Sequence, residues 1–213
     1  MTDRARVTAI VLAGGRASRF GGSKLSLQLD GRSLLDRAIA AVATLADDIV
    51  LAGPVPDVLV GQPGASVRNV IDAEPFAGPL VALAGALREA RGSLALVVGG
   101  DMPSLVPAVL AAMVDRLDAD LELDAVILAP PAAATDEPPR RQVLPLALRV
   151  ESGASVSARA VVEGDRSLHR MLDRLRFVEL APADWLGLDP GALTLLDIDR
   201  PADLERIRGL DFQ

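Results

Sequence analysis

The chain has 213 residues, no cysteine and a formal net charge of −7. This length fits one α/β domain, and the absence of cysteine excludes disulfides, thiolate catalysis and cysteine metal sites. The negative charge argues against nucleic-acid binding, which usually requires a basic surface. The apolar runs are short, whereas a membrane-spanning helix needs about 20 apolar residues, and the N-terminus lacks the apolar core of a signal peptide. We therefore expect a cytoplasmic protein that is not associated with a membrane.

Apolar runs that suit buried strands alternate with helical patterns along the chain. The predicted strands span residues 7–11, 48–51, 67–71, 94–98, 125–129, 143–148, 177–180 and 193–198. The predicted helices span residues 32–45, 79–90, 107–117, 153–163, 167–175 and 201–207. Continuously apolar strands in repeated strand–helix order indicate helices on both faces of a mostly parallel sheet. The sequence thus predicts a single α/β domain over residues 1–213, with three layers and a doubly wound sheet.

Residues 130–142 interrupt this alternation with two proline pairs and three alanines. Proline clusters between periodic segments are typical of loops. Because the next predicted strand begins at Val143, we interpret this segment as a surface loop or flap within the domain rather than as a linker.

Residues 12–24, directly after the first predicted strand, combine four glycines with the cations Arg16, Arg19 and Lys24. Glycines let a backbone approach a ligand closely, and successive backbone N–H groups in such a turn bind anions. The cations add donors suited to phosphate oxygens. This pattern predicts a loop that holds a triphosphate, with Lys24 as an exposed phosphate ligand; the alternative is a flexible glycine-rich surface loop.

Two well-known phosphate motifs do not fit this loop. A Walker A motif requires glycine directly before the lysine, and Ser23 occupies that position. The dinucleotide-binding fingerprint is also absent, because Gly14 and Gly15 are adjacent.

Acidic residues follow several predicted strands, where ligands bind in open α/β sheets. Asp101 follows Gly99-Gly100 and is a candidate Mg²⁺ ligand, with capping of the next helix as the alternative. Asp199 is a candidate second metal ligand, with the same alternative. Asp72 is a candidate acceptor for a ribose hydroxyl or a base edge, although aspartate also favours turns.

Other polar and aromatic residues point to structural roles. We expect Asp124 and Glu74 to be solvated surface acids. His169, the only histidine, lies in a predicted helix, and we interpret it as a surface or packing residue rather than a general base. Trp185 is expected to pack or to lie at a surface edge.

The pattern Leu-Ala-Gly-Gly-x-x-x-Arg-x-Gly-x-x-Lys at 12–24 resembles the signature of nucleotidyltransferases of the molybdenum cofactor guanylyltransferase type. Four later segments are similar to elements of that family in order and spacing: Asp72 with residues 76–80, 100–103, 145–148 and 197–204. The resemblance therefore extends over nearly the whole chain.

The resemblance implies a Rossmann-like enzyme that uses Mg²⁺ to transfer GMP from GTP to the phosphate of molybdopterin bearing molybdenum, releasing pyrophosphate. It also implies contacts with molybdoenzymes or cofactor-delivery proteins. Catalysis would depend on Arg19, Lys24 and Asp101, with Asp101 and Asp199 as metal ligands. The implied nucleotide-binding residues are Leu12, Ala13, Gly14, Gly15, Lys24, Asp72, Gly78 and Asp101.

Two departures from the family pattern keep alternatives open. The closing asparagines of the family appear here as Asp197 and Asp199, as in its cytidylyltransferase relatives, and the second strand is followed by Ala52-Gly53 rather than a polar residue. Gly14 and Gly78-Pro-Leu80 favour GTP. The alternatives are CTP, another phosphorylated acceptor such as a sugar phosphate, or a nucleotide-binding regulatory protein without turnover.

Overall fold

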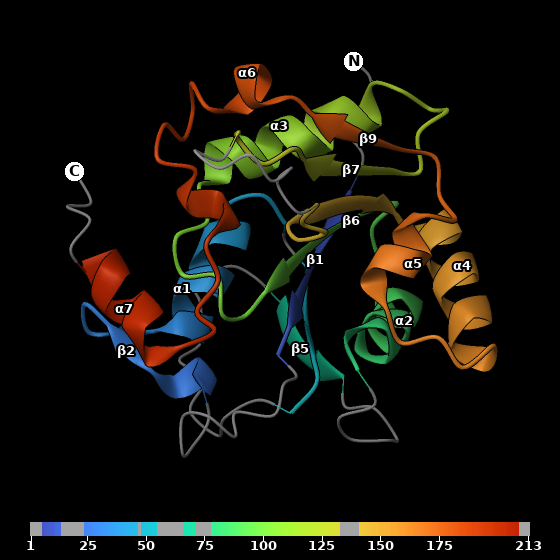
Figure 1. Ribbon diagram of the computed structural model, residues 1–213. Helices are drawn as coiled ribbons and strands as arrows, with labels where there is room; N and C mark the ends of the chain where they lie inside the picture. Colours follow the sequence, from blue (N-terminus) through green and yellow to red (C-terminus); the bar gives the residue numbers. More distant parts are fainter. Residues whose placement is uncertain are drawn as a thin grey trace.

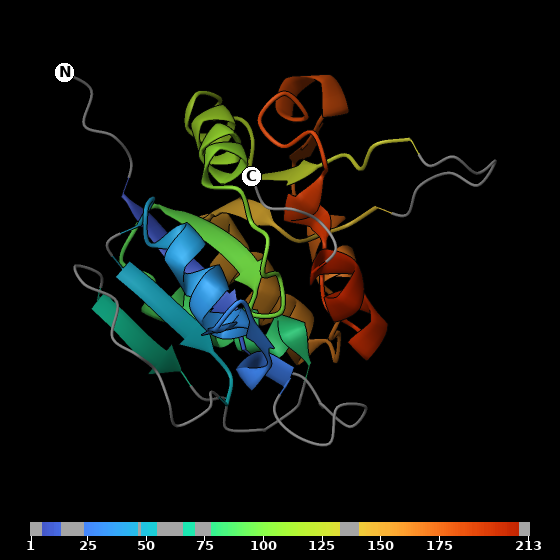
Figure 2. The same ribbon diagram turned by 90° about the vertical axis from the view of Figure 1, so that its left-hand side faces the viewer.

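The computed structural model describes residues 6–13, 24–46, 48–54, 66–70, 78–132 and 141–208. Its centre is a seven-stranded sheet with helices on both faces (Figures 1 and 2). The strands are β1 (Val7–Leu12), β4 (Asp48–Ala52), β5 (Ser66–Val70), β6 (Leu94–Gly99), β7 (Ala125–Leu128), β8 (Leu146–Arg149) and β9 (Phe177–Leu180). Their order across the sheet is β5-β4-β1-β6-β8-β7-β9. The predicted three-layer α/β fold is confirmed.

Five helices cover the two faces of the sheet. They are α1 (Leu34–Val42), α2 (Pro79–Glu89), α3 (Pro107–Asp118), α4 (Val150–Val162) and α5 (Leu168–Leu172). Helices α1 and α3 share one buried cluster with Ala9 and Val11, and α2, α4 and α5 share the other with Ile10 and Leu12 (Figure 1). Successive residues of β1 therefore enter opposite cores, which explains why the strand is apolar throughout.

The direction of each strand determines which strand ends lie along the same border of the sheet. Strand β1 is parallel to β4 and β6, β8 is antiparallel to β6 and β7, and β9 is parallel to β7. The carboxyl ends of β1, β6, β7 and β9 and the amino end of β8 therefore share one border of the sheet, called here the carboxyl edge. From β1 the chain runs outward to β4 and β5 and then returns to β6 on the other side of β1. This reversal makes a topological switch point between β1 and β6, where ligands bind in such sheets.

A small hairpin replaces the start of the first predicted helix. Strands β2 (Gln28–Leu29) and β3 (Arg32–Ser33) are joined by Asp30 and Gly31, whose φ angles are 51° and 76°. Asp-Gly is a strong hairpin signal because both turn positions need positive φ, and apolar periodicity alone does not reveal it. Helix α1 begins at Leu34, since the Ser33 hydroxyl accepts the Asp36 N–H at 3.0 Å.

The predicted strand over 193–198 is wrong. Residues Leu193–Leu195 form a short 3₁₀ helix, η2, and residues 196–199 have no regular structure. The Asp189 carboxylate accepts the backbone N–H groups of Leu193 and Thr194 at 3.0 and 2.7 Å. This side-chain capture of two N–H groups competes with strand pairing. The strand predicted over 143–148 is shorter than expected, because β8 begins only after Pro145.

Asp124 and Trp185 are both buried. Asp124 is only 8% exposed and pairs with Arg176 at 3.0 Å, so its assignment to the solvated surface is wrong. Trp185 is fully buried in α6 (Pro182–Trp185), which confirms packing and not a surface edge.

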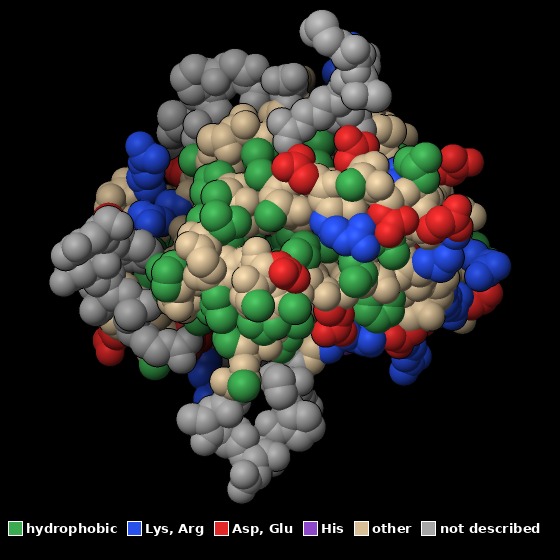
Figure 3. All heavy atoms as spheres, turned by 90° about the horizontal axis from the view of Figure 1, so that it is seen from above, with side chains coloured by type: hydrophobic (Ala, Val, Ile, Leu, Met, Phe, Trp, Pro, Cys, Tyr) green, Lys and Arg blue, Asp and Glu red, His purple; other side chains and the backbone are tan. Residues whose placement is uncertain are grey.

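Within the described residues, no helix has the length and apolar character needed to cross a membrane. On the face shown in Figure 3, Lys and Arg side chains are interspersed with acidic and apolar ones.

Candidate functional site

A cleft of about 1160 Å³ opens at the carboxyl edge of the sheet. One part of its lining is acidic and consists of Asp101, Asp197 and Asp199. The other part comes from the approach to β8, the start of α5 and the end of β9. Residues that lie more than 90 positions apart in sequence therefore meet in one cavity.

Lys24 and two carboxylates form a compact charged cluster beside the switch point. The Lys24 Nζ lies 2.8 Å from the Asp101 Oδ2 and 3.1 Å from the Asp199 Oδ1. The Lys24 side chain is 15% exposed, so the expectation of an exposed loop lysine is wrong. Burial lowers the pKa of Lys24, but hydrogen bonds and charges from Asp101 and Asp199 outweigh it and raise the pKa. The ammonium group therefore stays charged at neutral pH.

The Gly99-Gly100 pair determines where Asp101 lies. A Cβ atom on Gly99 would meet the Asp101 Oδ1 at 2.5 Å, and one on Gly100 would meet the Leu12 carbonyl oxygen at 3.3 Å. The Gly100 N–H donates to the same Leu12 oxygen at 2.9 Å. The two glycines thus bring Asp101 against the end of β1, because neither position has room for a side chain. Helix α3 has Val106 as its N-cap, so the alternative that Asp101 caps this helix is wrong.

The second acidic segment reaches the cluster from the far end of the sequence. The Ile198 N–H donates to the Asp101 carbonyl oxygen at 3.0 Å, which joins the two acidic segments. The Asp203 carboxylate accepts the N–H groups of Asp199 and Arg200 at 3.0 and 2.8 Å, at the start of α7 (Pro201–Arg208). In the described part of the chain, the Asp199 carboxylate bonds to Lys24 and to no backbone N–H of α7.

Helix α7 fixes this segment by packing on the β2–β3 hairpin that follows Lys24 (Figure 1). The contact is an apolar cluster of Leu29, Leu34, Ile198, Leu204 and Ile207. The segments that carry Lys24 and Asp199 are therefore held by one small core.

The cluster has a donor set that fits Mg²⁺. Asp101 and Asp199 each direct one carboxylate oxygen at the Lys24 ammonium group. Mg²⁺ in phosphate-binding sites is held by one or two carboxylates together with water and substrate oxygens. Asp197 adds further negative charge nearby: burial, and then the charges of Asp199 and Asp101, raise the pKa of Asp197. No group of three or more His, Asp or Glu residues among those described forms a protein-only metal site.

The candidate nucleotide-binding residues are only partly described. Leu12 and Ala13 lie buried at the end of β1, and the Ala13 N–H donates to the Ala52 carbonyl oxygen at 2.8 Å. Gly78 is the N-cap of α2 with φ 110°, a conformation that favours glycine, and the next residue, Pro79, lines the cleft. Gly14, Gly15, Arg16, Arg19 and Asp72 lie outside the described residues, as do residues 133–140 of the proline-rich loop.

The other wall of the cleft was not predicted from the sequence. It includes Arg141, Gln142 and Glu179, with His169 beside them. The His169 Nε2 lies 3.1 Å from the Arg141 carbonyl oxygen. A carbonyl only accepts, so Nε2 must carry a proton and donate it. His169 is exposed, which confirms its interpretation as a surface residue, and it contacts the backbone of Arg141. The one available signal was Glu179, an acid near the carboxyl end of an otherwise apolar strand.

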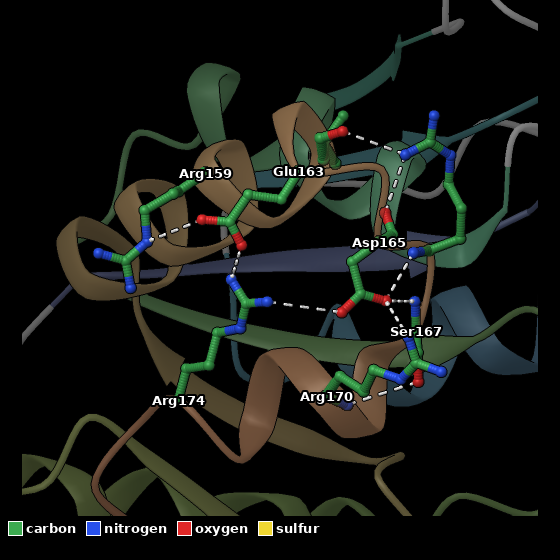
Figure 4. Close-up of polar contacts among 8 residues, drawn as sticks. Arg159, Glu163, Asp165, Ser167, Arg170 and Arg174 are labelled. Atoms are coloured by element: carbon green, nitrogen blue, oxygen red, sulfur yellow. Dashed lines mark hydrogen bonds and ion pairs between the residues drawn. The ribbon is translucent and has the colours of Figure 1, made fainter.

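A polar cluster fixes the start of α5, which carries His169 (Figure 4). The Asp165 carboxylate accepts the N–H groups of Arg166 and Ser167 at 2.8 and 3.1 Å. Arg174 bridges the Glu163 carboxylate at 2.6 Å and the Asp165 carboxylate at 3.7 Å. These contacts join the end of α4 to the start of α5, whose residues Ser167, Leu168 and His169 line the cleft.

The chain is similar in sequence to known nucleotidyltransferases over most of its length. A model of the MobA-like NTP transferase domain matches residues 9–180. A probable molybdenum cofactor guanylyltransferase of Chloroflexus aggregans is 31% identical over 205 residues, which cover 95% of this chain and 93% of the relative. A molybdenum cofactor guanylyltransferase of Desulfosudis oleivorans is 25% identical over 201 residues, which cover 94% of this chain and 93% of the relative.

A solved structure supports the fold. The molybdopterin-guanine dinucleotide biosynthesis protein A of Archaeoglobus fulgidus matches with a TM-score of 0.71 and 21% identity, over 94% of this chain and 96% of that chain. The prediction that the chain is an enzyme of the nucleotidyltransferase class is confirmed by the family match, which covers most of the chain. The chain belongs to the MobA-like NTP transferase family and is a nucleotidyltransferase.

Proposed function

We propose that the protein transfers GMP from GTP to the phosphate of molybdopterin, with release of pyrophosphate. The relatives that match nearly the full chain are named guanylyltransferases of the molybdenum cofactor, which supports this substrate pair. The observation that carries the proposal is the Lys24–Asp101–Asp199 cluster at the switch point, where a nucleotide binds in such sheets. We include a cytoplasmic location and contacts with proteins that deliver or receive the cofactor in the same proposal.

The reaction is an in-line displacement at the α-phosphorus of the nucleotide. An oxygen of the acceptor phosphate forms a bond to that phosphorus, and the bond to the pyrophosphate oxygen breaks. Because the attacking phosphate is already ionised, no general base is required. Catalysis then depends on positioning and on neutralising the charge that develops on the leaving group.

Each residue of the cluster has a defined task in this proposal. Lys24 exchanges its carboxylate partners for phosphate oxygens of the bound nucleotide. Asp101 and Asp199 would hold Mg²⁺, which when bound supplies positive charge beside the phosphates. Arg19 remains a predicted second phosphate ligand. Leu12, Ala13, Gly14, Gly15, Asp72 and Gly78 remain predicted contacts of the base and ribose.

Competition between GTP and CTP tests the base and the reaction together. We expect pyrophosphate release with molybdopterin as acceptor and a preference for GTP. Gly14→Ala should erode that preference, because small steric changes in a pocket alter discrimination by about 1–3 kcal/mol. The carboxylates at 197 and 199, as in cytidylyltransferases, favour CTP as the second candidate. A wild-type preference for CTP would show that the proposed base is wrong. Pyrophosphate release only with a sugar phosphate as acceptor would show that the proposed acceptor is wrong.

A further inference from the structure

Two buried polar side chains without a part in the proposed reaction lie next to the acidic segment of the cleft. Asp189 is 3% exposed and Thr194 is fully buried. Both lie outside the cleft lining, whereas Leu195, Asp197 and Asp199 belong to it. Burial of a carboxylate is unfavourable unless hydrogen bonds compensate it. The contacts of these two side chains therefore indicate what they contribute.

The Asp189 carboxylate holds the first turn of η2. Its two oxygens accept the N–H groups of Leu193 and Thr194 at 3.0 and 2.7 Å. Its carbonyl oxygen accepts the Ala192 N–H at 2.9 Å. Ala192 has a φ angle of 50°, a left-handed conformation that a residue other than glycine keeps only where its surroundings impose it. Asp189 therefore imposes the turn that leads the chain into η2.

Thr194 attaches this turn to the segment that follows Asp101. The Thr194 Oγ1 accepts the backbone N–H of Val106, the N-cap of α3, at 3.1 Å. The first N–H groups of a helix have no partner within the helix itself. The Thr194 hydroxyl supplies the partner here, and it joins η2 to the start of α3.

The acidic segment is thus joined to the Asp101 segment on both sides of Asp197. On one side is the Thr194 contact, and on the other the Ile198 N–H donates to the Asp101 carbonyl oxygen at 3.0 Å. Between them, Leu195 packs in the buried cluster that includes residues of α1 and α3. A displacement of η2 would therefore move the acidic segment relative to Asp101.

We propose that Asp189 and Thr194 are positioning residues of the metal site, which fix the carboxylates of Asp197 and Asp199 relative to Asp101; this inference rests on the proposed function. Mg²⁺ requires near-ideal octahedral geometry, so it is sensitive to small displacements of its ligands. Groups that orient metal ligands from a further layer contribute strongly to metal affinity. The gain in nucleotide affinity that Mg²⁺ provides should therefore depend on the Thr194 hydroxyl.

Calorimetric titration with GTP, once with Mg²⁺ and once with a chelator, tests this proposal. The ratio of the two GTP affinities is called here the metal contribution. Thr194→Val has nearly the same shape as the wild-type side chain but no acceptor for the Val106 N–H. It should reduce the metal contribution about tenfold. Its GTP affinity in the chelator should equal that of wild type.

Two further threonine variants separate positioning from stability. Thr194→Ser retains the hydroxyl but loses a buried methyl group, so the melting temperature should fall while the metal contribution stays. Thr8→Val is the matched control at the amino edge of the sheet. Thr8 is fully buried, and its Oγ1 accepts the N–H groups of Arg91 and Gly92 at 3.1 and 2.9 Å. Thr8→Val should lower the melting temperature by about 4 °C and leave the metal contribution unchanged.

A variant of Asp189 tests the same positioning independently of Thr194. Asp189→Asn keeps one acceptor oxygen but presents an amide group to the other backbone N–H, so it should also lower the metal contribution. Trp185, the only tryptophan, is fully buried, and its carbonyl oxygen accepts the Asp189 N–H at 3.2 Å. Its fluorescence emission should stay that of a buried indole in each variant, which shows that this part of the chain remains packed.

The outcomes distinguish this inference from the proposed function. An unchanged metal contribution in folded Thr194→Val, or an equal loss in Thr8→Val, would overturn the inference. Wild-type protein that transfers GMP but binds GTP equally well without metal would overturn it too and leave the nucleotide supported. A preference for CTP, or for an acceptor other than molybdopterin, would contradict the proposed function alone, because the same ratio is then measured with the preferred nucleotide.

Discussion

Aspartates lie at both edges of the same sheet, with opposite consequences. At the amino ends of β7 and β9, Asp124 accepts the Arg176 N–H and Nε–H at 3.0 Å each and the Ser152 hydroxyl at 2.8 Å. Hydrogen bonding to Arg176 lowers the pKa of Asp124 to about 2, although burial opposes the shift. At the carboxyl edge, burial and two neighbouring carboxylates raise the pKa of Asp197.

This contrast separates stabilising charge from functional charge. The carboxylate of Asp124 is satisfied by the protein itself, so folding favours its ionised form. Three carboxylates around one lysine leave an excess of negative charge, which a metal ion or another cation must balance. Substitutions at the two edges test this contrast.

The first change removes one negative charge from the carboxyl edge. Asp101→Asn should lower turnover about 100-fold, equivalent to about 2.7 kcal/mol of transition-state stabilisation, and should raise the Mg²⁺ concentration needed for activity. Pyrophosphate release measured across a Mg²⁺ titration checks this. Asp184→Asn, an exposed acid in α6, is the control. Unchanged Mg²⁺ dependence in Asp101→Asn would remove Asp101 from the metal site.

The second change targets the amino edge. The folded pKa of Asp124 lies below its ordinary value, so its stabilisation is present above about pH 4 and is lost as the pH falls towards about 2. The shift corresponds to roughly 2 kcal/mol. Asp124→Asn should lose about this much unfolding free energy at pH 7, and the difference from wild type should shrink at acidic pH. Urea denaturation at several pH values measures it.

Activity provides the control for Asp124. The folded variant should retain wild-type turnover at neutral pH, because Asp124 lies at the edge opposite the cleft. A large loss of turnover in folded protein would contradict the separation of the two edges.

The third change removes the cation from the functional cluster. Lys24→Ala should lower turnover at least about tenfold, or roughly 1.4 kcal/mol. It also leaves Asp101 and Asp199 without their shared partner, so Mg²⁺ should raise the melting temperature of the variant more than that of wild type. Kinetics and thermal melts with and without Mg²⁺ test both effects. Wild-type kinetics in Lys24→Ala would contradict its phosphate-binding role.

The smallest expected effect concerns a positioning residue. Asp203→Ala removes the acceptor for the N–H groups of Asp199 and Arg200 and should lower activity about threefold, or roughly 0.7 kcal/mol. Asp203→Asn retains an acceptor and should recover most of the activity. The Mg²⁺ requirement should rise only in the alanine variant. Equal activity in alanine and asparagine variants would show that the backbone at Asp199 is fixed by α7 packing alone.

The sequence alone determined the fold class and singled out all three residues of the charged cluster, Lys24, Asp101 and Asp199. Strands such as β1 and β6 are recognisable because residues buried on both faces must all be apolar. Gly99-Gly100 before Asp101 marked a close backbone approach, and the strand ends placed Asp101 near the predicted phosphate loop. The Asp30-Gly31 dipeptide was a local signal for the hairpin, although the apolar periodicity does not reveal it.

Tertiary structure decided the surroundings of each charge. Lys24 meets partners 77 and 175 positions away, and no local pattern encodes that burial. Asp124 is stabilised by Arg176, which directly precedes β9. Asp197 and Asp199 lie in an irregular segment and not at the end of a strand. The cleft wall joins Arg141, which precedes β8, to Phe177 and Glu179 of β9, and no local pattern encodes that contact. Apolar periodicity reports which side chains are buried, whereas the partner of a buried polar group depends on contacts between distant segments.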